Sequence, residues 1–251
     1  MAERPDWSAG EGLSVVRVIG SPSAAYLVTN GTSTMLVDTG PSTMRRRLQR
    51  ALGALGVERI DWIALTHSHY DHAGNARWAR ERYGARVIVH RAEARSLADG
   101  VGDEPGVRPV GSNLLTRFVT NTFAGRIARR LRFEPCAGDI IVEGAYDLSP
   151  LGLDARIIHT PGHSVGSMSV IVGSSLALAG DALFGVFPGA IFPPFASDVP
   201  ALVRSWGVLL GTSCSVFLPA HGGARGRDLV EREYSRRLPF TAESENDSRN
   251  R

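Results

Sequence analysis

The first forty residues alternate between short apolar runs and turn-forming residues. Runs rich in Val, Ile and Leu extend over residues 14–20, 24–29 and 33–40, and Asn30-Gly31 separates the second run from the third. Runs of this length are typical of strands, and Asn-Gly is a strong signal for a hairpin turn. The pattern therefore predicts an antiparallel meander.

Helical spacing of apolar residues follows. Met44, Leu48, Leu52 and Leu55 lie three or four positions apart, and arginines occupy the other side of the predicted helix. The spacing predicts an amphipathic helix, with Ser42 as its expected N-cap.

Strands and helices then alternate along most of the chain. Strands are predicted at residues 60–66, 85–90, 138–144, 155–160, 167–172, 175–180 and 215–220, and helices at residues 75–84, 198–210 and 227–237. Such alternation is typical of helices packed on sheets. We therefore expect an α/β protein with two sheets flanked by helices.

A single domain over residues 1–240 is the expected organisation for a chain of 251 residues. An insertion at about residues 95–134 fits neither pattern, and residues 241–251 form a polar segment expected to be disordered. The insertion is either an amphipathic helix packed on the core or a cap over the active site. Its apolar residues at helical spacing are Leu115, Phe118, Val119, Ile127 and Leu131, with Phe123 offset to one side.

The composition is that of a globular protein, with 43% hydrophobic and 21% charged residues. The net charge is only +3, and the arginine runs at residues 45–47 and 129–130 lack the interleaved aromatic residues of a single-strand-binding groove. Nucleic acid is therefore not an expected partner. A small-molecule substrate is expected instead.

The two cysteines, Cys136 and Cys214, show no metal-binding spacing and are interpreted as core residues. The first twelve residues contain no apolar run, and no stretch approaches the roughly 18 apolar residues of a membrane-spanning helix. We expect a cytoplasmic protein without a membrane segment.

Three of the seven histidines fall within residues 67–72, directly after a predicted strand. In an extended segment, His67 and His69 project to the same side and can share one cation, whereas Asp71 and His72 diverge and can reach a second. Imidazole and carboxylate groups are suitable ligands for Zn, Fe or Mn. The spacing therefore suggests two metal sites.

Further ligand candidates follow other predicted strands. His163, Asp181 and His221 each lie in a glycine-containing turn, and such strand-end loops commonly carry functional groups. Asp181 has an alternative role as a cap of the turn or helix that follows it. His90 and His159 end predicted strands and are interpreted as non-ligands.

The ordered motifs resemble those of the metallo-β-lactamase superfamily, and within it the branch that includes glyoxalase II. THSHYDHAGN is similar to the HxHxDH signature, TPGHSVGS to the later histidine motif, GDALF to the bridging-aspartate motif, PAHGG to the final histidine motif and LVDTG to an early buried aspartate. Together these motifs span residues 34–223.

The resemblance implies a four-layer αβ/βα sandwich of two mixed sheets flanked by helices, with two divalent metal ions at one edge. Zn²⁺ is the expected metal, with Fe or Mn as alternatives. The implied ligands are His67, His69 and His163 for the first ion, Asp71, His72 and His221 for the second, and Asp181 as a bridge. The implied role of Asp38 is to hold a histidine or the backbone near the site.

The implied reaction is hydrolysis of a thioester, ester or lactone of a small acyl substrate by a metal-bound hydroxide, with Asp71 orienting the attacking water. Residues 184–195, rich in Phe and Pro, form either an apolar wall beside the metals or a segment buried against the core. Tyr70 has either a packing role or a contact with substrate. Only 30 residues follow His221, so we do not expect the C-terminal helical region with which glyoxalase II binds its glutathione thioester.

Three other functions remain as alternatives. The excess of arginine fits a phosphodiesterase or nuclease with the same centre. A mononuclear iron enzyme that oxidises a persulfide would need only one group of ligands. A non-catalytic binding module is the fourth interpretation.

Overall fold

The strands of the first half of the chain form one sheet. The computed structural model describes residues 6–9, 12–102, 108–109 and 132–249, with residues 108–109 and 239–249 described by their backbone alone. Strands β1 to β4 pair in antiparallel fashion, which confirms the predicted meander, and the remaining strands continue from β4 in parallel. In spatial order the sheet contains β1 (Trp7–Ala9), β2 (Leu13–Ile19), β3 (Ala25–Thr29), β4 (Thr34–Val37), β5 (Trp62–Ala64), β6 (Arg86–His90) and β8 (Ile140–Val142).

The second half of the chain supplies a second mixed sheet. Strands β10, β11 and β12 pair in antiparallel fashion, and β12 pairs with β14 in parallel. In spatial order this sheet contains β15 (Arg225–Gly226), β14 (Val216–Pro219), β12 (Leu176–Gly180), β11 (Met168–Val172), β10 (Ala155–His159) and β9 (Tyr146–Asp147). A short antiparallel pair joins β7 (Arg108–Pro109) to β13 (Phe195–Ala196).

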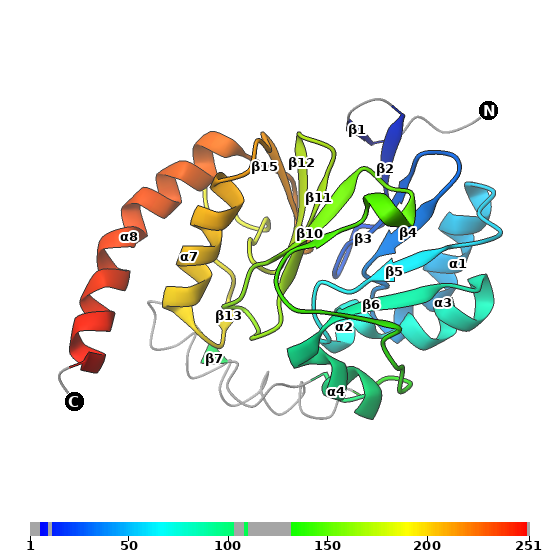
Figure 1. Ribbon diagram of the computed structural model, residues 1–251, viewed down its shortest axis with the longest axis horizontal. Coiled ribbons are helices and arrows are strands. Elements are labelled where there is room, and N and C mark those ends of the chain that lie inside the picture. Colours follow the sequence, from blue (N-terminus) through cyan, green and yellow to red (C-terminus); the bar gives the residue numbers. More distant parts are fainter. Residues whose placement is uncertain (1–5, 10–11, 103–107, 110–131, 250–251) are drawn as a thin grey trace.

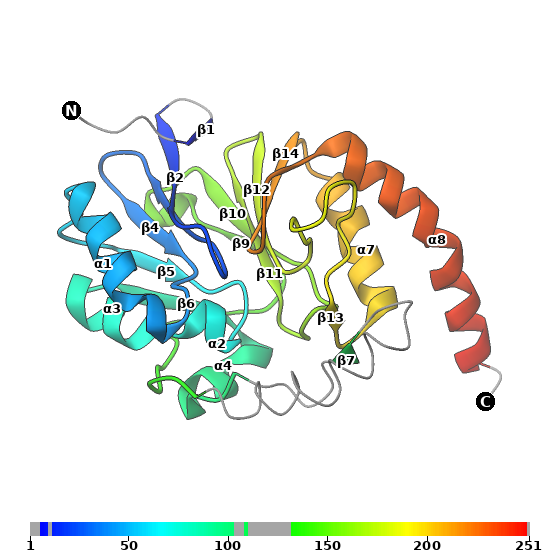
Figure 2. The same ribbon diagram turned by 180° about the vertical axis from the view of Figure 1, so that it is seen from behind.

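Helices cover the outer faces of the two sheets (Figure 1). The first sheet carries α1 (Arg45–Ala54), α3 (Ala76–Tyr83) and α4 (Arg91–Asp99), whereas the second carries α7 (Val199–Leu210) and α8 (Arg227–Arg249). A short helix, α2 (Tyr70–Ala73), and the 3-10 turns η1 (Ser42–Met44) and η3 (Ser149–Leu151) lie in connections. Figure 2 shows the same layers from behind, with the helices still on the outside of both sheets.

Three apolar layers explain why so many strand residues are hydrophobic. In β4, Met35 and Val37 point into the layer between the sheets, and Leu36 points into the layer beneath the helices. In β12, Leu178 faces the other sheet and Ala177 faces the helices of the second half. Because side chains alternate along a strand, a sheet buried on both faces requires apolar residues at consecutive positions. The predicted four-layer sandwich is thus confirmed.

Two local predictions differ from the structure. Ser42 begins the turn η1, and α1 starts after Met44 without a side-chain cap, because the Ser42 hydroxyl lies 3.2 Å from the hydroxyl of Tyr70. The backbone of α8 is helical to Arg249, where a disordered segment was predicted at residues 241–251. This segment contains neither glycine nor proline to end the helix.

The predicted helix with Leu115, Phe118, Val119, Phe123, Ile127 and Leu131 lies outside the described residues. Cys136 and Cys214 are buried and unpaired, as predicted for core residues. In the part of the chain that the structure describes, no helix has the length and apolar character needed to cross a membrane.

The sheets bring several strand ends to a common edge. β4, β5 and β6 run parallel to one another in the first sheet, as do β10, β12 and β14 in the second. The two edges are joined by backbone hydrogen bonds, from Met168 N to Thr66 O at 2.8 Å and from Ala24 N to Ala220 O at 2.6 Å. Loops that leave the carboxyl ends of these strands therefore meet at one place.

Candidate metal centre

The segment from Thr66 to His72 leaves β5 and is fixed by Asp38 at the end of β4. Asp38 accepts hydrogen bonds from Thr66 N and from Thr66 Oγ1, each at 2.8 Å. Helix α2 then turns the chain, because the amides of His72 and Ala73 both donate to His69 O at 2.9 Å. This turn places His67 and His72 in the buried interior at the sheet edge.

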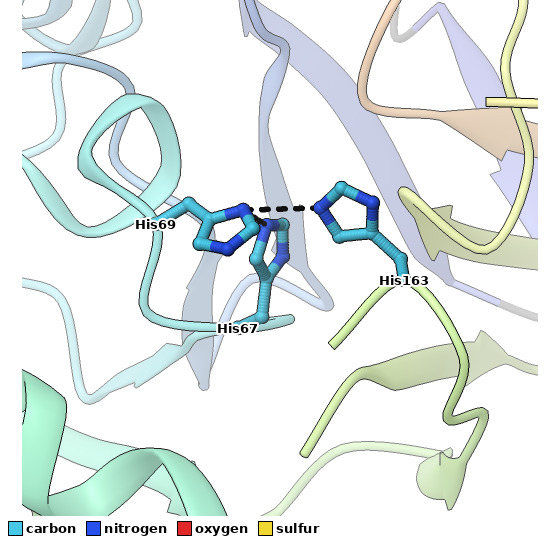
Figure 3. A group of neighbouring side chains, drawn as sticks. All are labelled: His67, His69 and His163. Carbon is cyan, nitrogen blue, oxygen red and sulfur yellow. Dashed lines mark hydrogen bonds between the residues drawn. The ribbon is translucent and has the colours of Figure 1, made fainter. Parts of the chain in front are cut away.

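Three imidazoles converge where the two sheets meet. Nδ1 of His69 lies 2.9 Å from Nε2 of His67 and 3.0 Å from Nε2 of His163 (Figure 3). His163 comes from the loop after β10, so the group joins the two halves of the chain.

A second group lies beside the first. Asp71 Oδ2 is 3.3 Å from His221 Nε2 and 3.7 Å from His72 Nε2. His221 follows β14, and its backbone carbonyl accepts a 2.6 Å hydrogen bond from Gly185 N.

Asp181 lies between the two groups. Its carboxylate oxygens are 3.6 Å from His72 Nε2, 3.5 Å from His163 Nε2 and 3.3 Å from His221 Nε2. The structure thus brings together all seven residues that the sequence singled out. Among the described residues, three groups have ligand atoms within 4.8 Å of one another: His67, His69 and His163; His67, His72 and Asp181; and Asp71, His72 and His221.

The outer ring nitrogens fix the tautomers of the histidines. His72 Nδ1 donates to Asp38 Oδ2 at 2.8 Å, His163 Nδ1 to Phe195 O at 2.9 Å and His221 Nδ1 to Pro22 O at 2.8 Å. In a neutral imidazole that donates through one nitrogen, the other nitrogen carries a lone pair. Where these rings are neutral, as in histidines that bind a metal ion, the inner Nε2 atoms therefore carry lone pairs that face the centre.

His67 follows the same rule. The Thr66 hydroxyl donates its one hydrogen to Asp38, so it can only accept from His67 Nδ1 at 3.1 Å. This assignment leaves a lone pair on His67 Nε2. The two Nε2 lone pairs of His67 and His163 then face one nitrogen of His69, which can donate to only one of them.

Two buried atoms of the cluster have no hydrogen-bond partner in the described part of the chain, namely His72 Nε2 and Asp181 Oδ1. Buried polar atoms are rarely left without a partner, because each one costs about 1–3 kcal/mol. A divalent cation satisfies such atoms together with inward lone pairs, and histidine and carboxylate are typical ligands of zinc. The donor set therefore fits metal ions.

Comparison with known proteins agrees with this geometry. The family model of the metallo-β-lactamase superfamily matches residues 18–221, which include every residue of the cluster. The chain belongs to the metallo-β-lactamase superfamily. This assignment confirms the resemblance that the ordered motifs suggested.

Relatives within the superfamily carry hydrolase names. The chain is 28% identical to a hydroxyacylglutathione hydrolase from Acidiphilium cryptum over 182 residues, which are 72% of this chain and 58% of that protein. It is 30% identical to a "Probable metallo-hydrolase" from Methanocaldococcus jannaschii over 66% of this chain and 69% of that protein. The fold is similar to that of a superfamily protein from Sulfolobus tokodaii, with a TM-score of 0.63, 22% identity and coverage of 90% and 86% of the two chains.

The histidines of the first ligand group and those of the second differ in their charge. Burial, together with the neighbouring imidazoles, lowers the pKa of His67 well below its usual range and that of His69 to about 4. Burial opposes protonation of His72 and His221 as well, but nearby carboxylates outweigh it and raise their pKa to about 9 and about 11. The carboxylates that stabilise positive charge here would equally stabilise a cation.

Asp71 and Asp181 remain ionised. Burial alone would raise the pKa of each carboxyl, but His72 and His221 hold both pKa values below the usual range. The Asp71 side chain is 32% exposed, compared with 8% for Asp181. Asp71 is therefore the carboxylate that solvent can reach.

The remaining aromatic candidates lie around the cluster without joining it. Tyr70 packs against the layer beneath the first-half helices, in agreement with a packing role. His90 and His159 stack with their ring centroids 4.3 Å apart, and neither is a member of the three groups. Their absence from these groups agrees with the interpretation of the two histidines as non-ligands.

The loop at residues 184–195 combines both roles considered for it. Ile191 is buried, and Phe192 packs edge-on against Trp206. At the other end, the Phe184 ring lies 5.5 Å from the ring of His221, and Phe187 is 63% exposed. One end is thus anchored in the core, and the other forms an apolar surface next to the cluster.

Sequence reasoning missed Glu93, a fully buried carboxylate in the first turn of α4. Burial alone would raise its pKa, but hydrogen bonds from Ser164 and Ser68 lower it, so Glu93 is ionised. The available signal was an acidic residue three positions after the end of a strand. That signal did not show which residues would pack on it.

Proposed function

We propose that the protein is a metal-dependent hydrolase that binds two divalent cations in the cluster and cleaves an ester, thioester or lactone. The observation that carries the proposal is the convergence of inward-facing imidazole nitrogens on Asp181, together with two buried atoms of the cluster that have no hydrogen-bond partner in the described part of the chain. Two cations would satisfy these atoms together, with each histidine in its neutral form.

The ligands divide into two groups that share Asp181. His67, His69 and His163 would hold the first cation, Asp71, His72 and His221 would hold the second, and Asp181 would contact both. Such ions polarise a carbonyl oxygen and lower the pKa of a water molecule, which makes a nucleophile available at neutral pH. Zn²⁺ suits this donor set.

The chain's own residues supply orientation and a hydrogen-bond acceptor. The carboxylate of Asp71 is ionised and partly exposed, so it is placed to accept a hydrogen bond from an attacking water and orient it. Asp38 and the carbonyls of Pro22 and Phe195 hold the imidazoles from outside the cluster. A site held in this way needs little reorganisation when substrate arrives.

An acyl substrate with an apolar portion fits the surface beside His221. Phe184, Val186 and Phe187 lie on the loop that follows Asp181, and the last two are 50% and 63% exposed. Arg225 fixes this loop by donating to Phe187 O at 3.0 Å and to Ala190 O at 3.2 Å. The apolar side chains therefore lie on a fixed surface.

The test combines metal analysis with a substrate panel on one preparation. We expect two metal ions per chain and turnover of at least one acyl ester, thioester or lactone. His67→Ala should lose both metal and activity, whereas His159→Gln, which alters a histidine outside the ligand groups, should keep both. Full metal content without turnover across the panel would contradict hydrolysis of acyl substrates.

Two further arms separate the alternatives. Cleavage of bis-p-nitrophenyl phosphate in place of the acyl panel would indicate a phosphodiesterase. One iron per chain with oxygen-dependent consumption of a persulfide would indicate the mononuclear oxidation reaction, in which the group formed by Asp71, His72 and His221 would stay without metal.

A further inference from the structure

Glu93 is a carboxylate close to the cluster that belongs to none of its three candidate ligand groups. It lies in the first turn of α4, immediately after β6, and it has no exposed surface. Burying a charged group is costly unless hydrogen bonds compensate for the lost water. The contacts of Glu93 therefore indicate what it does.

Both carboxylate oxygens are fully used, each by one backbone amide and one hydroxyl group. Oε2 accepts from Ser68 N at 3.0 Å and from the Ser68 hydroxyl, and Oε1 accepts from Ser164 Oγ at 2.6 Å and from Gly166 N at 3.1 Å. All four donors belong to the two loops that carry the first histidine group.

Two of these donor residues are sequence neighbours of the candidate ligands. Ser68 lies between His67 and His69, and Ser164 directly follows His163. One loop leaves the first sheet after β5 and the other leaves the second sheet after β10. A single carboxylate thus ties together the loops of three imidazoles that come from different halves of the chain.

The second group is held by other contacts. Asp38 binds His72, Pro22 O accepts from His221, and the Ser23 hydroxyl donates to the carbonyl of Asp71. The four hydrogen bonds that Glu93 accepts come from Ser68, Ser164 and Gly166, and so from none of these three ligands. A change at Glu93 should therefore affect one group of ligands more than the other.

We propose that Glu93 is a positioning residue for the first cation site, which sets the separation of the His67–His69 loop from the His163 loop. This inference rests on the proposed function, because it requires the three imidazoles to bind a metal ion. Residues that orient ligands from outside a metal site typically contribute roughly 10–100-fold to metal affinity.

Glu93→Gln is the sharpest substitution. Glutamine keeps the size of the side chain but turns one oxygen into an NH₂ donor, which would face a backbone N–H of either Ser68 or Gly166. Serine hydroxyls can rotate to adapt, but a backbone amide cannot. One of the two loops must therefore lose its backbone hydrogen bond to residue 93.

The experiment is titration of the metal-free full chain with Co²⁺ and Zn²⁺, followed by absorption spectroscopy and calorimetry. For Glu93→Gln we expect one of two binding steps to weaken by roughly 10–100-fold, with an altered cobalt spectrum for that step. The second step should remain within about threefold of the wild type. Asp99→Asn is the matched control, since it removes an exposed carboxylate from the same helix and should leave both steps unchanged.

Ser164→Ala provides a milder variant in case Glu93→Gln fails to fold. It removes one hydrogen bond to Oε1 without changing charge, and it should weaken the same step by a smaller factor. If both substitutions act through this bond, their effects in the double variant should be less than additive.

The outcomes separate the two proposals. Suppose that the wild-type protein binds two ions and that Glu93→Gln and Ser164→Ala bind them with unchanged affinity and spectra. The proposed role of Glu93 is then overturned, and the hydrolase proposal stands. Equal weakening of both steps also overturns it, because it shows a general loss of structure. If the wild type binds no divalent ion, both proposals are overturned.

Discussion

Asp38 holds His72 from the side opposite to the candidate cations, with Oδ2 2.8 Å from Nδ1. Asp38 is also the one described residue other than glycine with a positive φ, at 58°. This conformation costs energy for most residues, although aspartate and asparagine tolerate it better than others. The strained backbone directs the carboxylate to Thr66 and His72 together.

Asp38→Asn should therefore weaken metal binding without adding backbone strain. Asparagine tolerates the positive φ, but its side-chain amide is neutral and has only one acceptor oxygen. The carboxylate of Asp38 accepts from three donors, namely Thr66 N, Thr66 Oγ1 and His72 Nδ1. We expect zinc affinity to fall by roughly 10–100-fold and activity at limiting zinc to fall with it. Zinc titration against a competing chelator measures the change.

Asp154→Asn is the matched control, because Asp154 is exposed and precedes β10, whereas His163 follows the opposite end of that strand. It should bind zinc as the wild type does. Equal zinc affinity in Asp38→Asn and wild type would show that the Asp38 contact does not support the cluster.

The close approach of Gly222 and Gly185 gives a second prediction. Gly222 has a φ of 90°, and an added Cβ would overlap the backbone of Gly185. Gly222→Ala should destabilise the fold by at least roughly 1–3 kcal/mol and displace the neighbouring His221. Chemical unfolding and metal content of the purified variant check both effects.

Gly223→Ala is the control for the neighbouring position. Its added Cβ would meet only the Arg225 side chain, at 3.8 Å, and its φ is not positive. We expect near wild-type stability and metal content. Similar behaviour of the two alanine variants would argue against a packing constraint at Gly222.

The sequence was sufficient to predict the layers and the positions of the clustered residues. Each predicted strand overlaps an observed strand, because strands buried on both faces leave continuous apolar runs such as the one in β12 (Leu176–Gly180). His163, Asp181 and His221 were found because each is a chemically distinctive residue after such a run. Parallel strand direction then brings these loops to one edge.

What the sequence did not reveal depends on contacts between distant segments. Glu93 and Ser164 are 71 positions apart, and only the folded chain places one against the other. Ser42 has the side chain of a good N-cap, but its hydroxyl contacts Tyr70 instead, and the helix starts three residues later. Two-residue strands such as β13 (Phe195–Ala196) are too short to produce a periodic pattern.

Tyr26 gives a prediction for the alkaline range. Burial raises its pKa to about 12, and its hydroxyl donates to Pro219 O at 3.1 Å. The neutral phenol is therefore favoured in the folded state, and its contribution to stability is complete below about pH 10, the usual tyrosine pKa. As pH rises from about 10 towards 12, the unfolded state loses the proton first and this contribution declines, by at most roughly 3 kcal/mol.

Tyr26→Phe removes both the hydrogen bond and the titration. At neutral pH the wild type should be more stable by roughly 1 kcal/mol, and the difference should narrow above about pH 10. Urea unfolding of both proteins from about pH 7 to pH 11 measures it. A constant difference across this range would show that the Tyr26 pKa is not raised.

Phe187→Ala tests the apolar surface next to the cluster. Phe187 is 63% exposed and its ring lies 6.2 Å from that of Phe184, which in turn contacts His221. Because a partly exposed apolar contact contributes roughly 1 kcal/mol, the KM for p-nitrophenyl octanoate should rise about threefold to tenfold, with little change for p-nitrophenyl acetate. Val208→Ala, which truncates an exposed apolar residue on α7, should change neither value. Metal content should match the wild type in both variants. A loss of metal in Phe187→Ala would show that the side chain stabilises the loop. An equal rise in KM for both esters would exclude a contact between Phe187 and the acyl chain.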